Sequence, residues 1–436
     1  MVKVVSRRGW QAGVVVEPVV SSQAPPAATG RRALLLSSAR ELFGLHGYDA
    51  TSTHAIAKHA GVSQSLVYRH FPSKSELFVE AVFDPFVDML DSFLQRWDLT
   101  DAAGSIDAIT RSVTAALCSN VREERELLLA VLAARVLRAG PDEAGRSVRA
   151  VLSRVFGRIE EEHIRAAQAH KLRTDPPLTA RFFFGLGLVA AVFDDWLFPG
   201  QSETQIEHAL SAFVAAGASG RPDQSIIDLE RSAWIETDEQ SAMDTTPPYG
   251  RQRPAGSVRP LLLVAARRLF ASSGYSATST KQIASSAEIA ESLLFHHFAT
   301  KSALFEAAIT EPLAAALHEL TTHISECPTP QRAIVDAYDS LYACRDLLDA
   351  AVIAPREIGK DSAIQAQLAG LLSALEHKFT GHDDLNAGQS ARLVLSLVLA
   401  VTSFHDWLFI GMDTCPARER LLAELVPFAL SGTTRR

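Results

Sequence analysis

The stretch GVSQSLVYRHFPSKSELF, residues 61–78, decides the fold of the N-terminal part of this chain. It combines a turn glycine, hydroxyl groups, an aromatic ring and basic side chains within two short helix-sized segments. A related stretch, EIAESLLFHHFATKSALF, returns at residues 288–305. The chain therefore carries one structural unit twice, and the second copy differs from the first at specific positions.

The residues before this stretch predict two further helices. Apolar side chains at helical spacing indicate an amphipathic helix over residues 32–46, which Gly47 ends. Hydroxyl side chains at 51–53 favour the start of a short second helix, and Gly61 ends it. A third helix begins at Ser63 or Gln64, and Ser73 with Glu76 forms a capping box for a fourth.

Two short helices joined by a tight turn form a helix-turn-helix, in which the second helix enters the major groove of DNA. The exposed side of that helix carries hydrogen-bonding side chains, namely Gln64, Ser65, Tyr68, Arg69 and His70. Glutamine matches an adenine edge and arginine matches guanine. Thr53 and Lys74 lie at predicted helix N-termini, where backbone N–H groups and positive charge favour phosphate.

The segment TSTHAIAKHAGVSQSLVYRHFPSKSELF resembles the DNA-binding unit of the tetracycline-repressor (TetR) family of transcriptional regulators. The resemblance implies three helices for DNA, further helices for ligand binding and dimerisation, and a dimeric repressor released by a ligand. By position it implies that Gln64, Ser65, Arg69 and His70 face bases or nearby phosphates. It also implies backbone contacts from four residues, namely Thr53, His54, Tyr68 and Lys74.

The second copy aligns without a gap at an offset of 227 residues, and 25 of the 48 positions in 258–305 match 31–78. Groups able to meet phosphate or bases remain at Thr280, Lys281, Ser292, His296, His297 and Lys301. The turn glycine becomes Glu288, Gln64 becomes Glu291, and Tyr68 becomes Phe295. A carboxylate accepts a hydrogen bond from cytosine, so Glu291 is compatible with a reading helix. The alternative is a half that is retained only for structure.

Composition and charge fit a helical protein with local contacts to a polyanion. The chain has 436 residues, 47% hydrophobic and 21% charged, and helical apolar spacing favours the all-α class. Its formal charge is −8, yet 31–78 and 258–305 each sum to +3, which leaves −14 elsewhere. Four cysteines without a CxxC motif favour reduced, buried thiols and a cytoplasmic location, and no apolar run is long enough to span a membrane.

The order of segments predicts two complete units in tandem. We expect a flexible basic tail (1–30), the first helix-turn-helix domain (31–78), a helical body (79–217), a linker (218–257), the second helix-turn-helix domain (258–305) and a second body (306–431). Residues 178–198 and 388–409 share an apolar pattern that ends in Asp-Trp-Leu-Phe. We expect these two segments to pair within one chain as a pseudo-dimer, and a dimer of chains is the alternative.

The bodies give weaker signals. The residues expected to line a pocket for an apolar or aromatic effector are Phe83, Phe86, Leu90, Phe93, Leu128, Leu132, Phe156, Phe183, Phe184 and Trp196. Core packing is the better explanation for any one of these side chains. Neither His163 with His170 nor His382 with its two aspartates has the spacing of metal ligands, so no metal or cofactor is expected.

Three classes of function follow from these patterns. A DNA-binding regulator accounts for the caps, the turns and the basic islands together. The alternative is a helical ligand- or partner-binding protein that descends from such a regulator and has lost DNA binding in one or both units. An enzyme is disfavoured, because the sequence has no nucleophile elbow, phosphate loop, zinc spacing or flanked carboxylate pair.

Overall fold

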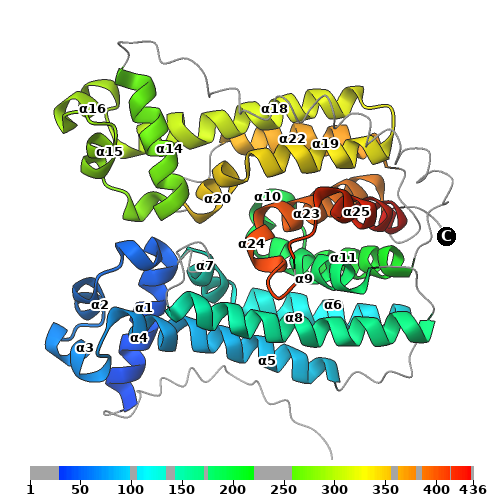
Figure 1. Cartoon of the computed structure of the whole chain (residues 1–436), viewed down its shortest axis with the longest axis horizontal. Helices are drawn as coiled ribbons and strands as arrows, with labels where there is room; N and C mark the ends of the chain where they lie inside the picture. Colours follow the sequence, from blue (N-terminus) through cyan, green and yellow to red (C-terminus); the bar gives the residue numbers. More distant parts are fainter. Residues whose placement is uncertain are drawn as a thin grey trace, which may run out of the picture.

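The computed structural model describes residues 29–98, 106–133, 143–170, 175–219, 258–354, 362–379, 385–412 and 414–433. These residues form helices and connecting turns, with no strand among them, as the all-α prediction requires. The first unit and the second unit lie side by side, and their small N-terminal domains occupy the same end of the molecule (Figure 1). The tail before residue 29 and most of the expected linker lie outside the described residues.

The first unit begins with a small domain that leads directly into a helical body. The small domain contains α1 (Thr29–Ala50), α2 (Thr53–His59), α3 (Gln64–His70) and α4 (Lys74–Phe78). A π-helical turn, η1 (Val79–Phe83), continues α4 into the body. The body contains α5 (Asp84–Asp98), α6 (Ile106–Glu123), α7 (Arg125–Ala133), α8 (Glu143–His170), α9 (Pro176–Val192), α10 (Asp194–Leu197) and α11 (Glu203–Ser219).

The second unit repeats this order. Its small domain contains α14 (Val258–Ala277), α15 (Thr280–Ser286), α16 (Glu291–His297) and α17 (Lys301–Phe305), followed by the π-helical turn η2 (Glu306–Thr310). Its body contains α18 (Glu311–Glu326), α19 (Pro330–Ala343), α20 (Arg345–Ile353), α22 (Ser362–Glu376), α23 (Ala387–Ser403), α24 (His405–Leu408) and α25 (Arg418–Thr433).

Each small domain is held by a three-ring aromatic cluster. Phe43 stacks on Tyr48, and Phe78 meets both rings edge-on with centroids 5.1 Å away. Within α1, Gly47 has φ 77° and ψ 171°, so the backbone leaves the helix where the sequence predicted a break. The Thr51 hydroxyl lies within hydrogen-bonding distance of two carbonyls in this region, and Gly274 and Thr278 repeat the arrangement.

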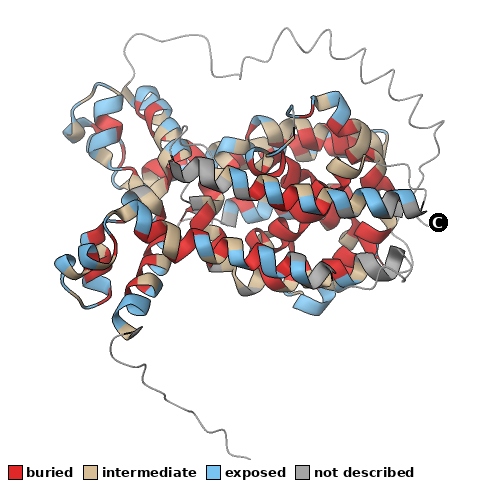
Figure 2. Cartoon of the chain, turned by 60° about the horizontal axis from the view of Figure 1, so that its bottom comes forward, coloured by how far each residue is buried: buried red, intermediate tan, exposed pale blue. Residues whose placement is uncertain are grey.

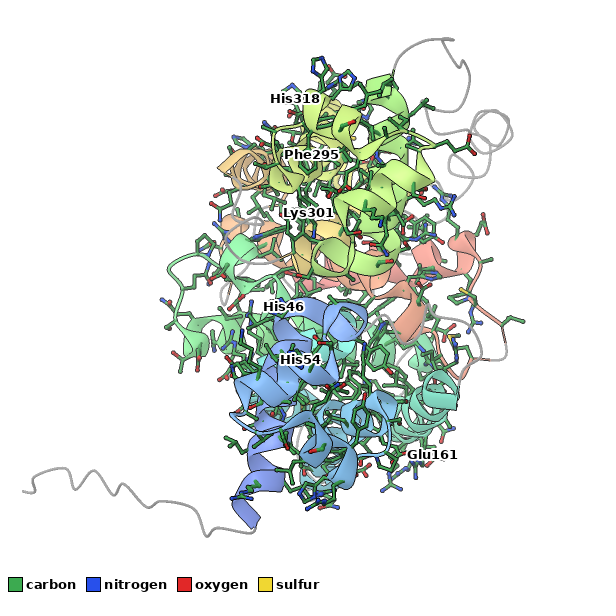
Figure 3. The ribbon with its side chains drawn as sticks, turned by 90° about the vertical axis from the view of Figure 1, so that its left-hand side faces the viewer. His46, His54, Glu161, Phe295, Lys301 and His318 are labelled. Atoms are coloured by element: carbon green, nitrogen blue, oxygen red, sulfur yellow. The ribbon has the colours of Figure 1, made fainter. Side chains whose placement is uncertain are left out.

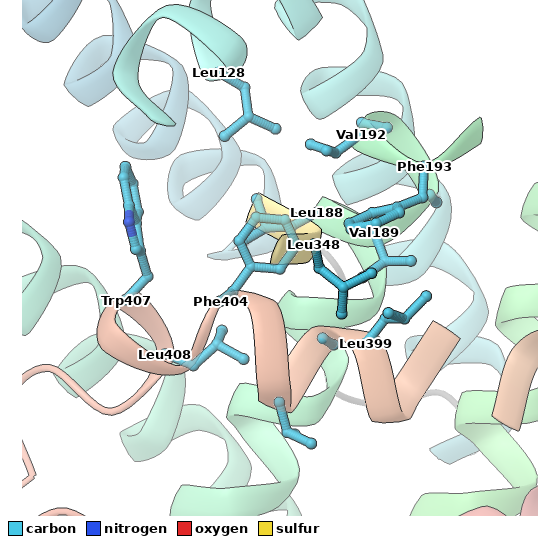
Figure 4. Packing of buried hydrophobic residues seen from close by; sticks show 14 of the residues in the cluster. Leu128, Leu188, Val189, Val192, Phe193, Leu348, Leu399, Phe404, Trp407 and Leu408 are labelled. Atoms are coloured by element: carbon cyan, nitrogen blue, oxygen red, sulfur yellow. The ribbon is translucent and has the colours of Figure 1, made fainter. Parts of the chain in front are cut away.

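The two bodies share one apolar core. Helix α9 packs against α23, and α11 packs against α25. In Figure 4 the side chains of Leu188 and Phe193 of the first unit lie beside Phe404 of the second. The Phe193 and Phe404 rings meet edge-on with centroids 6.3 Å apart. Figure 2 shows buried residues on the inward faces of the bodies and exposed residues on the outward faces.

Polar contacts also cross between the bodies. Arg181 is fully buried, forms an ion pair with Glu160 of its own unit, and donates to the carbonyl of Ile410, 3.2 Å away in the other unit. The carboxylate of Glu424 in α25 accepts from the backbone N–H of Asp175, just before α9, over 2.9 Å. Because buried polar groups must find partners, these bonds fix how one body is placed against the other.

Each of the two segments that were expected to pair is interrupted near its end. The segments 178–198 and 388–409 are not continuous helices, since each breaks near its C-terminal end, at Phe193 and Phe404. Both phenylalanines turn inward, and the chain restarts as a single helical turn that carries the Asp-Trp-Leu motif. Cys415 is exposed, whereas the other three cysteines are buried as expected. Among the described residues, no helix is long and apolar enough to cross a membrane.

Candidate nucleic-acid interface

Helix α3 is the second helix of the first helix-turn-helix, and we call it the first reading helix. It is seven residues long, and local signals determine where it begins and ends. Gly61 adopts φ 63° in the turn before it, a conformation that glycine takes without a steric penalty. Val67 is completely buried and anchors the inner face of the helix. Ser52 caps the preceding α2, because its hydroxyl accepts from the backbone N–H of Ala55 over 3.0 Å.

The outer face of α3 presents the side chains that the sequence assigned to DNA. Gln64, Ser65, Tyr68 and Arg69 are exposed, and His70 is partly exposed. His54 is exposed on the neighbouring α2. Figure 3 views this end of the molecule, with His54 in the first small domain and Phe295 and Lys301 in the second. The predicted contact residues of both units therefore lie at one end of the molecule.

Thr53 has a position that the sequence prediction did not anticipate. Its side chain is buried, with 8% exposure, so it does not stand free for a phosphate. The amide of Gln64 donates to the Thr53 hydroxyl over 3.2 Å, and the hydroxyls of Thr53 and Tyr68 lie 3.0 Å apart. Thr53 thus connects Gln64, which was predicted to face bases, to Tyr68. The signal for this role is that threonine is kept in both copies while both of its partners change.

The lysines after the reading helices rest on aromatic rings. Lys74 Nζ lies 4.3 Å from the centre of the Tyr48 ring, and Lys301 Nζ lies 4.1 Å from that of Tyr275. Burial lowers the pKa of Lys301. A cation above a ring has limited freedom, so each ammonium group is positioned at the start of α4 or α17. This is the place where the sequence predicted phosphate contacts.

The second reading helix, α16, has the same backbone but a different surface. Glu288 replaces the turn glycine and keeps the left-handed conformation, with φ 57°. Lys281, Ser292, His296 and His297 are exposed in the positions that the sequence assigned to DNA. The Thr280 hydroxyl donates to a carboxylate oxygen of Glu291 over 2.7 Å. Phe295 replaces Tyr68 and is 48% exposed, an unusual exposure for a large apolar ring.

The residues predicted to line an effector pocket lie in the core of the first body. Phe86 meets Trp407 of the second unit edge-on, and Phe156 meets Phe184 in the same way. Burial lowers the pKa of His163 to about 4, which keeps this imidazole neutral. Leu132 and Trp196 are partly buried, and the other predicted residues are buried, namely Phe83, Phe86, Leu90, Phe93, Leu128, Phe156, Phe183 and Phe184. No group of three or more metal-ligating side chains occurs among the described residues.

Two helix-turn-helix domains with basic, hydrogen-bonding outer faces place the chain among the helix-turn-helix proteins of the DNA-binding class. The family described as bacterial regulatory proteins, tetR family, matches residues 35–81 and 262–308, which are the two small domains and the start of each body. The chain therefore carries the DNA-binding unit of the TetR family twice.

Individual relatives match parts of the chain. The HTH-type transcriptional activator FasR of Mycolicibacterium smegmatis is 47% identical over 66 residues, which are 15% of this chain and 30% of FasR. The HTH-type transcriptional regulator AcrR of Shigella flexneri is 25% identical over 170 residues, 38% of this chain and 79% of AcrR. The match to FasR thus covers less than a third of that protein's length.

Solved structures of single units are also similar. A protein from Mesorhizobium loti described as a TetR-family transcriptional regulator is 24% identical, with a TM-score of 0.34, and covers 44% of this chain and 96% of its own. A second such protein, from Shewanella sp. PV-4, is 21% identical, with a TM-score of 0.32, over 44% of this chain and 99% of its own.

Proposed function

We propose that this chain is a sequence-specific DNA-binding transcriptional regulator that acts as a single-chain pseudo-dimer. The observation that carries the proposal is the placement of two helix-turn-helix domains at one end of a shared helical core. The matched family consists of regulatory proteins, which favours a regulatory role over a catalytic one. Chromosomal DNA as the partner implies a cytoplasmic site of action.

The interface between the bodies supports the pseudo-dimer. In a homodimer of helix-turn-helix proteins, two-fold symmetry brings the same surface of each subunit together. Here α9 meets α23 and α11 meets α25, and these pairs occupy equivalent places in the two units. Helix α1 also contacts α14, so the two small domains touch each other directly. One chain therefore contains a surface arrangement that a homodimer forms from two chains.

We expect the first unit to make most of the contacts with the phosphate backbone of DNA. The Gln64 amide donates to the Thr53 hydroxyl, and the hydroxyls of Thr53 and Tyr68 share a further hydrogen bond in which either group can be the donor; in our proposal Thr53 donates. The Tyr68 O–H is then available to a phosphate oxygen. Hydrogen bonds in such a series polarise one another, so the phenol becomes a better donor. Thr53 is thereby a positioning residue, and Tyr68 and Lys74 make the contacts.

Effector control is proposed for the bodies. Helix α7 packs against α1, and the Arg125 side chain at its start donates to the Ala191 carbonyl over 2.7 Å. Helix α9 carries Ala191 and also forms the interface between the units. A small apolar or aromatic molecule bound among the aromatic side chains of the body would therefore act on the small domain, through α7 and α1, and on the interface, through α9. The second candidate, a partner-binding protein without DNA contacts, is favoured only by the exposed Phe295.

Binding to DNA from the chain's own upstream region, measured at several salt concentrations, tests the proposal. A regulator that contacts phosphates shows a linear fall of log K with log salt and prefers its site to random DNA, by about a thousandfold or more. Replacement of Tyr68 by phenylalanine or of Lys74 by alanine weakens binding to all sequences to a similar extent. Replacement of Gln64 or Arg69 instead changes the preferred sequence. Equal, salt-insensitive affinity for all DNA contradicts the proposal.

A further inference from the structure

The two reading helices differ in the direction of one hydrogen-bond series, and this difference has a consequence for base recognition. A threonine hydroxyl has one proton to donate. In the first unit the hydroxyl of Thr53 accepts from the Gln64 amide, and its own proton can go to Tyr68. In the second unit the corresponding proton, on Thr280, goes to the carboxylate of Glu291 over 2.7 Å.

The two substitutions in the second unit are therefore compatible with each other. A carboxylate has no proton to donate to the threonine, so Glu291 requires the threonine proton for itself. The phenol that competes for this proton in the first unit is absent, because phenylalanine occupies position 295. A drifting sequence loses partners one at a time and leaves polar groups unsatisfied. Here the phenol is lost at position 295 and a carboxylate is gained at position 291, and Thr280 keeps one short hydrogen bond, to Glu291.

The hydrogen bond from Thr280 also limits the rotamers of Glu291. The carboxylate is partly exposed at the first position of α16, the end of a reading helix that contacts base edges. It has acceptor capacity beyond the one bond from Thr280 and no donor. Lys281, His296 and His297 are exposed nearby on α15 and α16, and we expect these groups to meet the phosphates. Because the Glu291 carboxylate can only accept hydrogen bonds, it selects a base that offers a hydrogen-bond donor.

We propose that the second helix-turn-helix remains a DNA reader with a different base preference, in which Glu291, positioned by Thr280, accepts a hydrogen bond from the exocyclic amino group of cytosine. Cytosine N4 is the major-groove donor that glutamate recognises, whereas glutamine in the first unit matches adenine. The inference rests on the proposed DNA-binding function. The operator then has two unequal half-sites, and the second contains a cytosine opposite the N-terminus of α16.

Selection of binding sites from a library of random DNA duplexes by the full-length chain tests this inference. The wild-type chain is expected to enrich two unequal half-sites centred about one helical turn apart. Glu291→Gln changes the enriched base in the second half-site only, away from cytosine, by about 5- to 150-fold at that position. Gln64→Glu is the matched control, because it changes the first half-site only.

Two further variants distinguish a change in base recognition from a loss of folded structure. Thr280→Val removes the positioning hydroxyl and is expected to reduce the preference for cytosine without choosing another base, while Glu291→Asp retains part of it. Circular dichroism of each variant checks that the helices persist. A single enriched half-site that Glu291→Gln leaves unchanged overturns the inference but not the proposed function. Absence of any enriched sequence overturns the proposed function itself.

Discussion

Replacement of Gly185 by alanine tests the close approach of the two units. A Cβ atom at this position would lie 2.8 Å from Ala400 Cβ in α23 and 2.9 Å from Leu408 Cδ1. The end of the leucine side chain can rotate away, but Ala400 Cβ is fixed to the backbone of a packed helix. The two helices must therefore separate, and overpacking of this kind costs about 1–3 kcal/mol.

Gly157→Ala in α8 is the matched control. It also lies inside a helix, and a Cβ atom there would have no neighbour within 4 Å. Both variants gain about 0.5–1 kcal/mol because alanine is less flexible than glycine in the unfolded chain. The control is therefore expected to be more stable than the wild type, and Gly185→Ala less stable than the control by about 1–3 kcal/mol.

Equilibrium unfolding in urea, followed by far-UV circular dichroism, measures this difference. The midpoint should shift to higher urea for Gly157→Ala, and the slope should stay unchanged. If Gly185→Ala is as stable as the control, α9 and α23 do not meet at Gly185, and the reasoning about the shared core is wrong.

Three other predictions concern strain, buried charge and pH. Glu288→Gly is expected to stabilise the chain by about 1 kcal/mol, because a residue other than glycine costs about 1–2 kcal/mol in the left-handed conformation it adopts; urea unfolding that shows a loss contradicts this. Arg181→Met is expected to lose about 3 kcal/mol by leaving Glu160 and the Ile410 carbonyl without their partner, and Arg181→Met with Glu160→Gln should recover part of the loss in the same assay. Burial raises the pKa of Glu424, so its folded form binds protons more tightly than its unfolded form, and stability relative to Glu424→Gln should fall as pH rises from below its ordinary value through its folded value. A pH-independent difference between the two chains contradicts this last prediction.

The helix-turn-helix could be predicted from sequence because local rules determine it. Caps at Ser52 and Ser73 and turns at Gly47 and Gly61 act within a few residues of their partners. The second copy keeps Gly274 and the Ser279 cap, and its backbone follows the first although Glu288 and Thr300 replace Gly61 and Ser73. The exposed faces of α3 and α16 then follow from helix periodicity.

The breaks in the interface helices could not be predicted in the same way. Phe193 and Phe404 follow long apolar runs that continue the helical pattern, and the two rings meet edge-on between the units, a contact that local sequence does not reveal. The buried Arg181 depends on the Ile410 carbonyl, which is 229 residues away in the sequence. The role of Thr53 depends on side chains 11 and 15 residues away on another helix, and local rules do not specify how side chains of two helices meet.

The number of chains that bind one operator tests the central claim most directly. Sedimentation of the 47.2 kDa chain with a duplex obtained by selection measures this number. The account predicts one chain for each duplex at nanomolar concentration, with protection of two successive major grooves about 34–36 Å apart. Two chains for each duplex, or protection of a single groove, would contradict the single-chain pseudo-dimer.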